Sequence, residues 1–521
     1  MAAQAVRSRW SPRLVTAVVV ICLLGIYTLA LQPAGTSGGG TITPRSSSTP
    51  SGSSVGSLRE RRPLVEPATF GGVRRYAIPG ELDPKPWDGP PVSGVLHVFL
   101  KAMKWPDGHL RMKGFVFFEP ATLPQLWLDR KLGAYSLYNP PQVYYSLRMG
   151  LRSEAEGWER EISLETAVWA CERIANDTEH EACVHRTRDV LRNLPHTESP
   201  DISVDLGPTA ATDLQLFVYG WPRHVSLTSL LDGALAAPPP PPPRGPPALI
   251  FALPYFSHVD PDRVARLLGW STAYHAALGF QGAVMYVLAK HAAALRAHPG
   301  VRSLLASGRL RLVLWDEFAW LEGWRDFDLR VQNSHSVLSF WGEHVRVLVA
   351  DIDEFVVPLR RGDTLPKLLS SGCLASRPPE CLYIQRRNVF THGSGKPPVN
   401  EAQLWAEPGP LPLLQYRYRS MADHHLHNNP KALVDPSRVF PVHIHYSAVC
   451  AGTDQVAASS SKKGKLRSAC SKRRRCDWVP LDCVWIAHVP NMHRRRIRPG
   501  NQNISRIEPD DWLWAAAGAP A

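Results

Sequence analysis

Two aspartates follow a short apolar run late in the chain, where Val345–Ala350 leads into Asp351-Ile352-Asp353-Glu354-Phe355. Ligands of open parallel sheets bind beyond the carboxyl ends of the strands, and this acidic cluster falls at such an end. An Asp-x-Asp turn can direct two carboxylates toward one point, which suits a divalent ion such as Mn2+ or Mg2+. That ion would orient a diphosphate and neutralise charge on a leaving group. The alternative is a solvated acidic turn, because Asp-x-Asp alone is common.

Histidines gather further along the chain, in His424–His427 and in the apolar segment Val439–Tyr446. The first group could bind a metal, and an exposed polar loop explains it equally well. In the second group His443 and His445 are two residues apart in a strand pattern, so both face one side. One of them could complete a metal shell, since neutral imidazole is the commonest side-chain metal ligand. A buried structural histidine is the alternative.

The segments around the acidic motif alternate between strand and helix patterns. Near-continuous apolar runs separated by amphipathic helices indicate an α/β fold with a mostly parallel sheet. The predicted strands are Ala248–Leu253, Gly282–Leu288, Leu310–Leu314 and Val345–Ala350, and the predicted helices are Pro261–Leu278, His291–Ser307 and Gln332–Phe340.

The chain before this region divides by composition. Residues 1–13 carry three arginines, and the uncharged residues 14–31 are long enough for a membrane-spanning signal anchor with a cytosolic tail before it. A cleaved signal peptide is the alternative. Residues 32–91, which begin rich in Gly, Ser, Thr and Pro, are predicted to be a disordered stem. We expect an accessory lumenal domain rich in β structure over 92–235, a proline-rich linker over 236–247 and a catalytic domain over 248–510.

Eight cysteines lie outside the apolar run 14–31, and they fall in local groups that predict disulfides in an oxidising lumen. We predict that Cys373 and Cys381 are bonded to each other, because they flank a short loop. Two glycosylation sequons, at Asn176 and Asn503, fit a lumenal location. The alternative to disulfides among the last cysteines is a zinc site, whose ligands would be Cys470, Cys476, Cys483, His488 and His493. Their C-x5-C-x6-C spacing is not that of a zinc ribbon, which disfavours this alternative.

The net charge of +13 raises the possibility of nucleic-acid binding. Much of this charge is concentrated in 462–475 and 494–498, and no nucleic-acid module is recognisable. We therefore expect no nucleic-acid partner.

Several motifs occur in one order along 248–446, and together they resemble glycosyltransferase family 92. They are Phe251-Ala-Leu-Pro254-Tyr, Leu278-Gly279-Phe with Val284-Met-Tyr286, Arg330-Val-Gln332-Asn333, Ala350-Asp-Ile-Asp-Glu-Phe355 and Asn429-Pro-Lys431 followed by His443-Ile-His445. The resemblance implies a type II membrane protein with a GT-A-like (Rossmann-like) catalytic domain that inverts configuration. The sequence departs from the family at Gln332–His335, where neither an Asp nor a Cys follows, and this leaves acceptor-side details open.

Carried onto this sequence, the resemblance makes Asp351 and Asp353 the nucleotide-sugar and metal residues. His445 (or His443) would be the late metal ligand, and Lys431 would contact the diphosphate as a point charge. An inverting transfer also needs a general base. Asp423 and Glu401 are both placed for that role, and the sequence does not choose between them.

We therefore expect a glycosyltransferase that uses Mn2+ (or Mg2+) to move a hexose, galactose from UDP-galactose, to a glycan acceptor with inversion. Its expected location is a Golgi or other secretory-pathway membrane, crossed once in type II orientation with the catalytic domain in the lumen. The alternative is a catalytically inactive glycan-binding or chaperone-like protein of the same pathway.

Overall fold

The computed structural model of the chain describes part of its sequence in detail. The described residues are 70–82, 91–121, 147–162, 164, 201–208, 212–236, 247–253, 260–315, 325–360, 362–376, 380–390, 416, 418–420, 430–442, 447–450, 465–466, 473–489 and 507–509. The chain divides into two compact units, Met1–Arg62 and Pro63–Ala521. All described residues belong to the second unit.

A seven-stranded mixed sheet carries the acidic motif. Its strand order is β11-β10-β9-β12-β17-β14-β22, and the first four strands are parallel to one another. β17 runs antiparallel to both of its neighbours, and β14 pairs with β22 in parallel. The strands are β9 (Ala248–Leu253), β10 (Gly282–Leu288), β11 (Leu310–Trp315), β12 (Val345–Val349), β14 (Cys381–Ile384), β17 (Lys431–Val434) and β22 (Asp477–Trp478).

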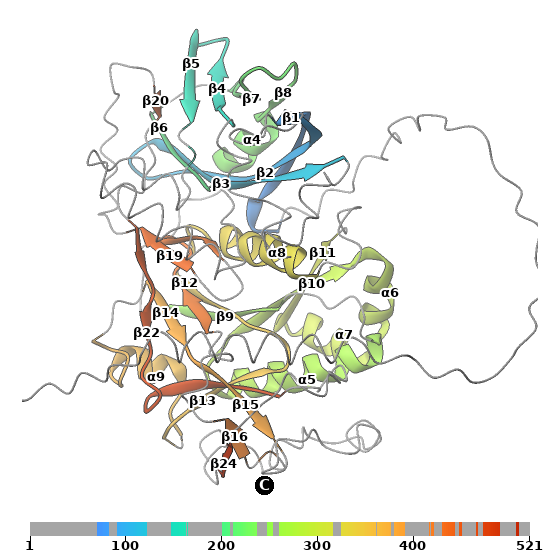
Figure 1. Cartoon of the computed structure of the whole chain (residues 1–521), viewed down its shortest axis with the longest axis vertical. Coiled ribbons are helices and arrows are strands. Elements are labelled where there is room, and N and C mark those ends of the chain that lie inside the picture. Colours follow the sequence, from blue (N-terminus) through green and yellow to red (C-terminus); the bar gives the residue numbers. More distant parts are fainter. Residues whose placement is uncertain are drawn as a thin grey trace, which may run out of the picture. The chain divides into compact units, whose positions relative to one another are not determined.

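Helices cover both faces of the parallel strands (Figure 1). α5 (Pro261–Ala277), α6 (Ala289–Ala297) and α7 (Pro299–Ala306) lie on one side of β9–β11, and α8 (Arg325–Ser339) lies on the other. α5 begins where the sequence predicts, because the Asp260 carboxylate accepts a hydrogen bond from Asp262 N and proline occupies the first helical position. The strand and helix alternation predicted over 248–350 is thus confirmed.

The helix predicted over His291–Ser307 is two helices. The chain breaks at His298, whose extended backbone separates α6 from α7 and whose ring accepts a hydrogen bond from Gly300 N. Pro299 is the physical reason, because a proline disfavours helical backbone at the preceding residue and itself suits the first position of a new helix.

The N-terminal described region is built from β structure. Its four-stranded antiparallel sheet has the order β1-β2-β3-β6, and a five-stranded sheet has the order β20-β5-β4-β7-β8. The first contains β1 (Arg74–Leu82), β2 (Val92–Lys104), β3 (His109–Pro120) and β6 (Asp201–Pro208). The second contains β4 (Met149–Ser153), β5 (Trp158–Ile162), β7 (Gln215–Val218), β8 (His224–Ser226) and, from much later in the chain, β20 (Lys465–Leu466). The short helix η1 (Phe70–Gly72) precedes β1, and the helix α4 (Thr228–Ala236) follows β8. β1 falls inside the 32–91 segment that we expected to be a disordered stem, so this part of the segment is a paired strand.

A third group of strands follows the acidic motif. β13, β23 and β15 pair in that order in one sheet, which continues through β16 to β24, and β18, β19 and β21 form a small sheet of their own. The bounds are β13 (Glu354–Pro358), β15 (Arg386–Phe390), β16 (Tyr418–Ser420), β18 (Val439–Val442), β19 (Ser447–Cys450), β21 (Arg473–Arg475), β23 (Val484–His488) and β24 (Ile507–Pro509), and the short helix α9 spans Leu365–Ser370.

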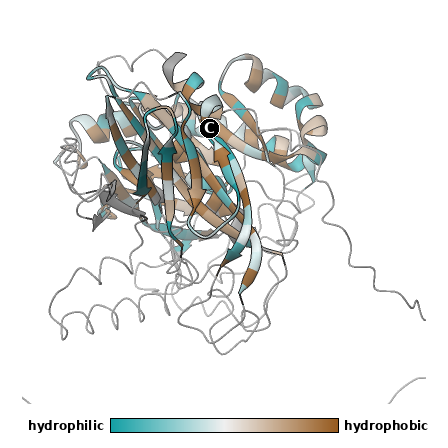
Figure 2. Ribbon diagram, turned by 90° about the horizontal axis from the view of Figure 1, so that it is seen from above, coloured by the Kyte–Doolittle hydropathy of each residue, from teal (hydrophilic) through white to brown (hydrophobic). Residues whose placement is uncertain are grey.

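One hydrophobic core joins the N-terminal sheets to the α/β region. Hydrophobic residues are concentrated along the strands, as the brown segments in Figure 2 show.

Two lysines of the N-terminal sheet form hydrogen bonds with later parts of the chain. Lys101 Nζ donates to Ser339 O at 2.7 Å, at the end of α8, and Lys113 Nζ donates to Ser437 O at 2.6 Å. The β-rich region therefore packs directly onto the α/β region.

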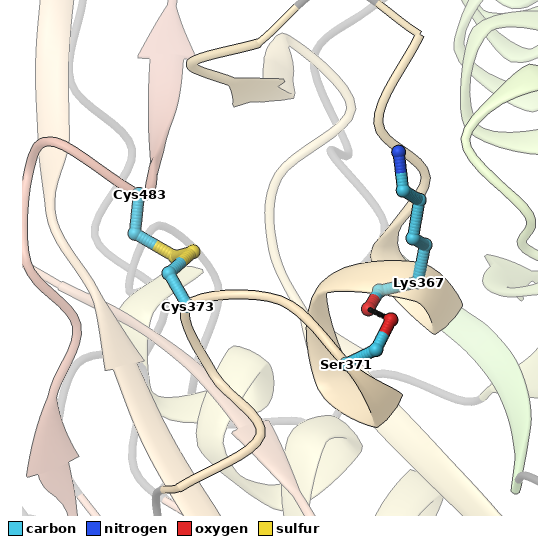
Figure 3. Close-up of a disulfide and its surroundings, with 4 residues drawn as sticks. All are labelled: Lys367, Ser371, Cys373 and Cys483. Carbon is cyan, nitrogen blue, oxygen red and sulfur yellow. Dashed lines mark hydrogen bonds between the residues drawn. A yellow bond between two sulfur atoms is a disulfide. The ribbon is translucent and has the colours of Figure 1, made fainter.

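Two disulfides link the segment after the acidic motif to the last core strands. Cys373 is bonded to Cys483 (Figure 3), and Cys381 is bonded to Cys476. The predicted bond between Cys373 and Cys381 is wrong. The reason is strand pairing: Leu382 of β14 lies opposite Asp477 of β22, which brings the neighbouring cysteines together with Cα atoms 4.8 Å apart.

The predicted fold class needs correction. The described residues form a mixed α/β structure with more strand than helix, rather than the expected GT-A-like domain with a separate β-rich domain and an N-terminal transmembrane helix. Among the helices of the described residues, none is long and apolar enough to cross a membrane. Residues 14–31, where that helix was expected, lie outside the described residues.

Candidate functional site

The acidic motif forms a tight turn at the carboxyl end of β12. Asp351, Ile352 and Asp353 connect β12 to β13, and Glu354 N donates to Asp351 O at 3.1 Å, which closes the turn. The backbone of Asp353 is also held, because its carbonyl accepts a hydrogen bond from Val489 N at 3.0 Å. The turn therefore lies at the strand edge where the sequence predicted it.

Glu354 fixes this turn from inside the protein. Its side chain is buried, at 1% exposure, and Oε2 accepts a hydrogen bond from Asp351 N at 2.7 Å. The same oxygen lies 3.1 Å from Lys431 Nζ, and Oε1 accepts from Arg386 Nη1, also at 3.1 Å. A carboxylate with three such donors is held firmly, so the backbone of Asp351 is held with it.

Lys431 is the buried counterion of the motif. Its Nζ donates to Asp351 Oδ2 at 3.1 Å in addition to its contact with Glu354, and its side chain is 1% exposed. β17 brings it there, because Ala432 lies opposite Val349 in the antiparallel pair with β12. Burial alone would lower the pKa of Lys431, but the two carboxylates outweigh it and raise this pKa. Burial acts to raise the pKa of Asp351, and the Lys431 ammonium reverses the shift, so this pKa lies below its usual value.

His488 completes the site from the last core strand. It lies opposite Glu354 in the antiparallel pair of β13 and β23, and its Nε2 is 3.5 Å from Asp353 Oδ2. On the other side of the ring, Nδ1 lies 2.6 Å from Asn388 Oδ1. Since an amide oxygen only accepts, Nδ1 carries the proton and the Nε2 lone pair faces Asp353. Burial lowers the pKa of His488, and the Asp353 carboxylate partly offsets this shift.

These residues fit a divalent cation only in part. Within the described part of the chain there is no group of three or more His, Cys, Asp or Glu side chains that could hold a metal ion. Asp353 and His488 nevertheless make a fitting pair, because a carboxylate and an imidazole lone pair that face each other at 3.5 Å suit a shared cation. Asp351 differs, since Lys431 already neutralises it.

Several predicted residues fall outside the described part of the chain. They are His443, His445, the histidines of 424–427, and the two candidate bases Asp423 and Glu401. The structure therefore brings together Asp351, Asp353 and Lys431 of the predicted set and does not place His445. The roles assigned to all four stay predictions.

Sequence reasoning missed three members of the site: His488, Asn388 and Arg386. His488 was considered only as a member of a zinc alternative, although it ends the apolar run Val484–His488, as Asp351 follows the run 345–350. That shared position, a polar residue at the end of a buried strand, is the signal that could have found it.

No model of a known protein family matches this sequence, and no curated protein matches it. The functional argument therefore rests on the residues of this chain and their geometry.

Proposed function

We propose that this protein is a metal-dependent glycosyltransferase whose divalent cation, Mn2+ or Mg2+, is held by Asp353 and His488. The observation that carries the proposal is the buried contact between Asp353 Oδ2 and the lone pair of His488 Nε2, at 3.5 Å. His488 replaces His445, which the family resemblance suggested, as the imidazole ligand that we favour. The position at the carboxyl end of β12 supports this, because diphosphate ligands of open α/β sheets bind at that edge.

The chemistry of the pair also favours a divalent cation. Lys431 pairs with Asp351 and Glu354, and Arg386 pairs with Glu354. Asp353 and His488 offer a carboxylate oxygen and an imidazole nitrogen 3.5 Å apart, and both are ligands that Mn2+ accepts.

Each residue of the site has a defined task in this proposal. Asn388 fixes the ring of His488 so that Nε2 faces the cation position. Glu354 holds the turn, and Lys431 holds the side chain of Asp351 rather than contacting a diphosphate directly. When bound, the cation would neutralise negative charge on the departing nucleoside diphosphate.

The substrates follow from the motif order described for residues 248–446. We propose a UDP-hexose donor, UDP-galactose first, and a glycan acceptor, with inversion at the transferred sugar. Two disulfides, Cys373–Cys483 and Cys381–Cys476, support folding in an oxidising compartment. We therefore propose the secretory-pathway lumen, the Golgi first, as the place of the reaction.

The test is nucleotide release by the purified full-length chain, incubated with a panel of nucleotide sugars, glycan acceptors and MnCl2. Asp353→Asn keeps the size of the side chain and removes its charge, so release should fall by a hundredfold or more, equivalent to about 3–4 kcal/mol of lost electrostatic stabilisation. His488→Gln should raise the Mn2+ concentration needed for half-maximal rate. Asp482→Asn removes an exposed carboxylate and is the matched control, with unchanged activity expected.

Two results would contradict the assignment. A folded Asp353→Asn protein with near-normal, metal-independent transfer would exclude the metal pair. No release from any donor by the wild-type chain, together with retained binding of glycans, would favour the glycan-binding or chaperone-like alternative instead.

A further inference from the structure

A small cavity lies beneath α5, in a part of the molecule that the proposed reaction does not use. It offers about 10 Å³ for the centre of a water molecule. Its wall is mainly apolar, with contributions from Phe251, Phe280 and Ala283, and its mouth reaches the exposed residues Gln281 and Arg309. Phe251 lies in β9, Ala283 lies in β10, and Arg309 directly precedes β11.

Two polar side chains that line this cavity each have one atom without a hydrogen-bond partner among the described residues. They are Thr272 and His275, one helical turn apart on α5, and their unpartnered atoms are Oγ1 and Nε2. Both side chains are buried, with exposures of 5% and 1%. Buried polar atoms in proteins are nearly always hydrogen-bonded, to protein groups or to water, so this pair needs an explanation.

The hydrogen bonds of His275 define what its free nitrogen requires. Nδ1 lies 2.8 Å from the carbonyl oxygen of Ser271, which can only accept, so Nδ1 carries the proton. Burial lowers the pKa of His275 to about 4, so the ring is neutral at physiological pH. Nε2 is therefore an acceptor that needs a donor. Stacking on Phe251, with ring centroids 4.1 Å apart, fixes the ring in this orientation.

We infer that this cavity is a binding site for a single internal water molecule, which donates a hydrogen bond to His275 Nε2 and shares a second one with Thr272 Oγ1. The size favours water over any larger ligand, because roughly 10–15 Å³ of such space is what one water requires. The polarity favours water over a dry cavity, because empty cavities are apolar. This site is independent of the glycosyltransferase proposal.

The water site would connect two parts of the structure that approach each other here. His275 also stacks on Phe355, which follows the acidic turn directly, with ring centroids 6.1 Å apart. Its neighbour Tyr274 donates a hydrogen bond from Oη to Val356 O at 2.7 Å. A water that forms hydrogen bonds with Thr272 and His275 therefore helps to hold α5 against β13.

The experiment is a crystal structure of the full chain, at a resolution that shows ordered water, with Thr272→Val as the test variant. Valine keeps the shape of threonine and removes the hydroxyl. Thr364→Val is the matched control, because the Thr364 hydroxyl makes no capping hydrogen bond at α9. We expect water density within hydrogen-bond distance of both Thr272 Oγ1 and His275 Nε2 in wild type and in the control.

In Thr272→Val we expect the loss of this density and a lower urea midpoint of unfolding than in the control. A cavity without density in the wild type would overturn the inference, as would density for a larger group. A water that persists unchanged in Thr272→Val would remove the threonine from the site. If crystals of the variant do not form, an unchanged urea midpoint counts against the proposal in the same way.

Discussion

The two disulfides are nested, and this arrangement predicts a specific pattern of stability loss. Cys373–Cys483 spans 110 residues and encloses Cys381–Cys476, which spans 95. On the chain-entropy account, a loop of about 100 residues contributes about 4.7 kcal/mol by restricting the unfolded chain. That value applies only to whichever of the two bonds closes first. The other bond then closes a much smaller ring.

The smaller ring consists of the two short arms between the bonds, from Cys373 to Cys381 and from Cys476 to Cys483. Together these arms are about 15 residues long, and a loop of this length contributes about 3 kcal/mol. Removing either bond alone should therefore cost about 3 kcal/mol. Removing both should cost about 8 kcal/mol, which is about 2 kcal/mol more than the sum of the single losses.

The assay compares urea unfolding of wild type with three variants: Cys373→Ala/Cys483→Ala, Cys381→Ala/Cys476→Ala and the variant that combines all four changes. Mass spectrometry without reduction verifies that each paired variant keeps its remaining bond. Losses from the two single pairs that add up to the loss from the combined variant would refute the nested arrangement. A loss near 5 kcal/mol from one pair alone, the value for an independent loop of about 100 residues, would refute it too.

Three further predictions concern single residues. Glu354→Gln should weaken Mn2+ binding by about 10–100-fold, because this carboxylate positions the acidic turn; calorimetry that shows unchanged affinity in a folded variant would contradict this. Burial lowers the pKa of Lys101 to about 8, so between pH 8 and 10.5 the unfolded chain binds more protons than the folded one. The free energy of unfolding of wild type should therefore rise relative to Lys101→Met by up to about 3 kcal/mol across that window, and urea titrations that show no such rise would exclude it. Gly279→Ala should lower the free energy of unfolding by about 1–3 kcal/mol more than Gly308→Ala in the same assay. Both glycines have positive φ, but of the two only Gly279 would place a new Cβ against another residue, with Pro366 Cδ at 2.7 Å. Equal losses in the two variants would rule out that clash.

The α/β core could be predicted because its signals are local. Ala248–Leu253 and Gly282–Leu288 are continuous apolar runs, and their strands have the predicted bounds. Asp260 and Pro261 mark the start of α5 by capping chemistry that needs no knowledge of the rest of the chain. β1 was missed because Arg74–Leu82 mixes arginine, glutamate, glycine and proline with few apolar residues, as an edge strand can.

The site could be predicted only where the chain is contiguous. Asp351 and Asp353 could be identified from their spacing after a buried strand. The contact of Asp353 with His488 depends on the register between β13 and β23, which are separated by more than a hundred residues, and no local pattern encodes that register. The cysteine pairing failed for the same reason, since proximity in sequence favoured Cys373–Cys381 while strand pairing selected more distant partners.

The contacts of Lys101 and Lys113 have a consequence for synthesis on the ribosome. Their acceptors, Ser339 O and Ser437 O, lie 238 and 324 residues further along the chain. At about 5–20 residues per second, the last acceptor emerges roughly 15–65 seconds after Lys113. The hairpin of β2 and β3 can form early, but the face that it presents to α8 stays uncovered until Ser339, 238 residues after Lys101, has been made. A nascent chain of this protein should therefore depend on chaperones until α8 has emerged.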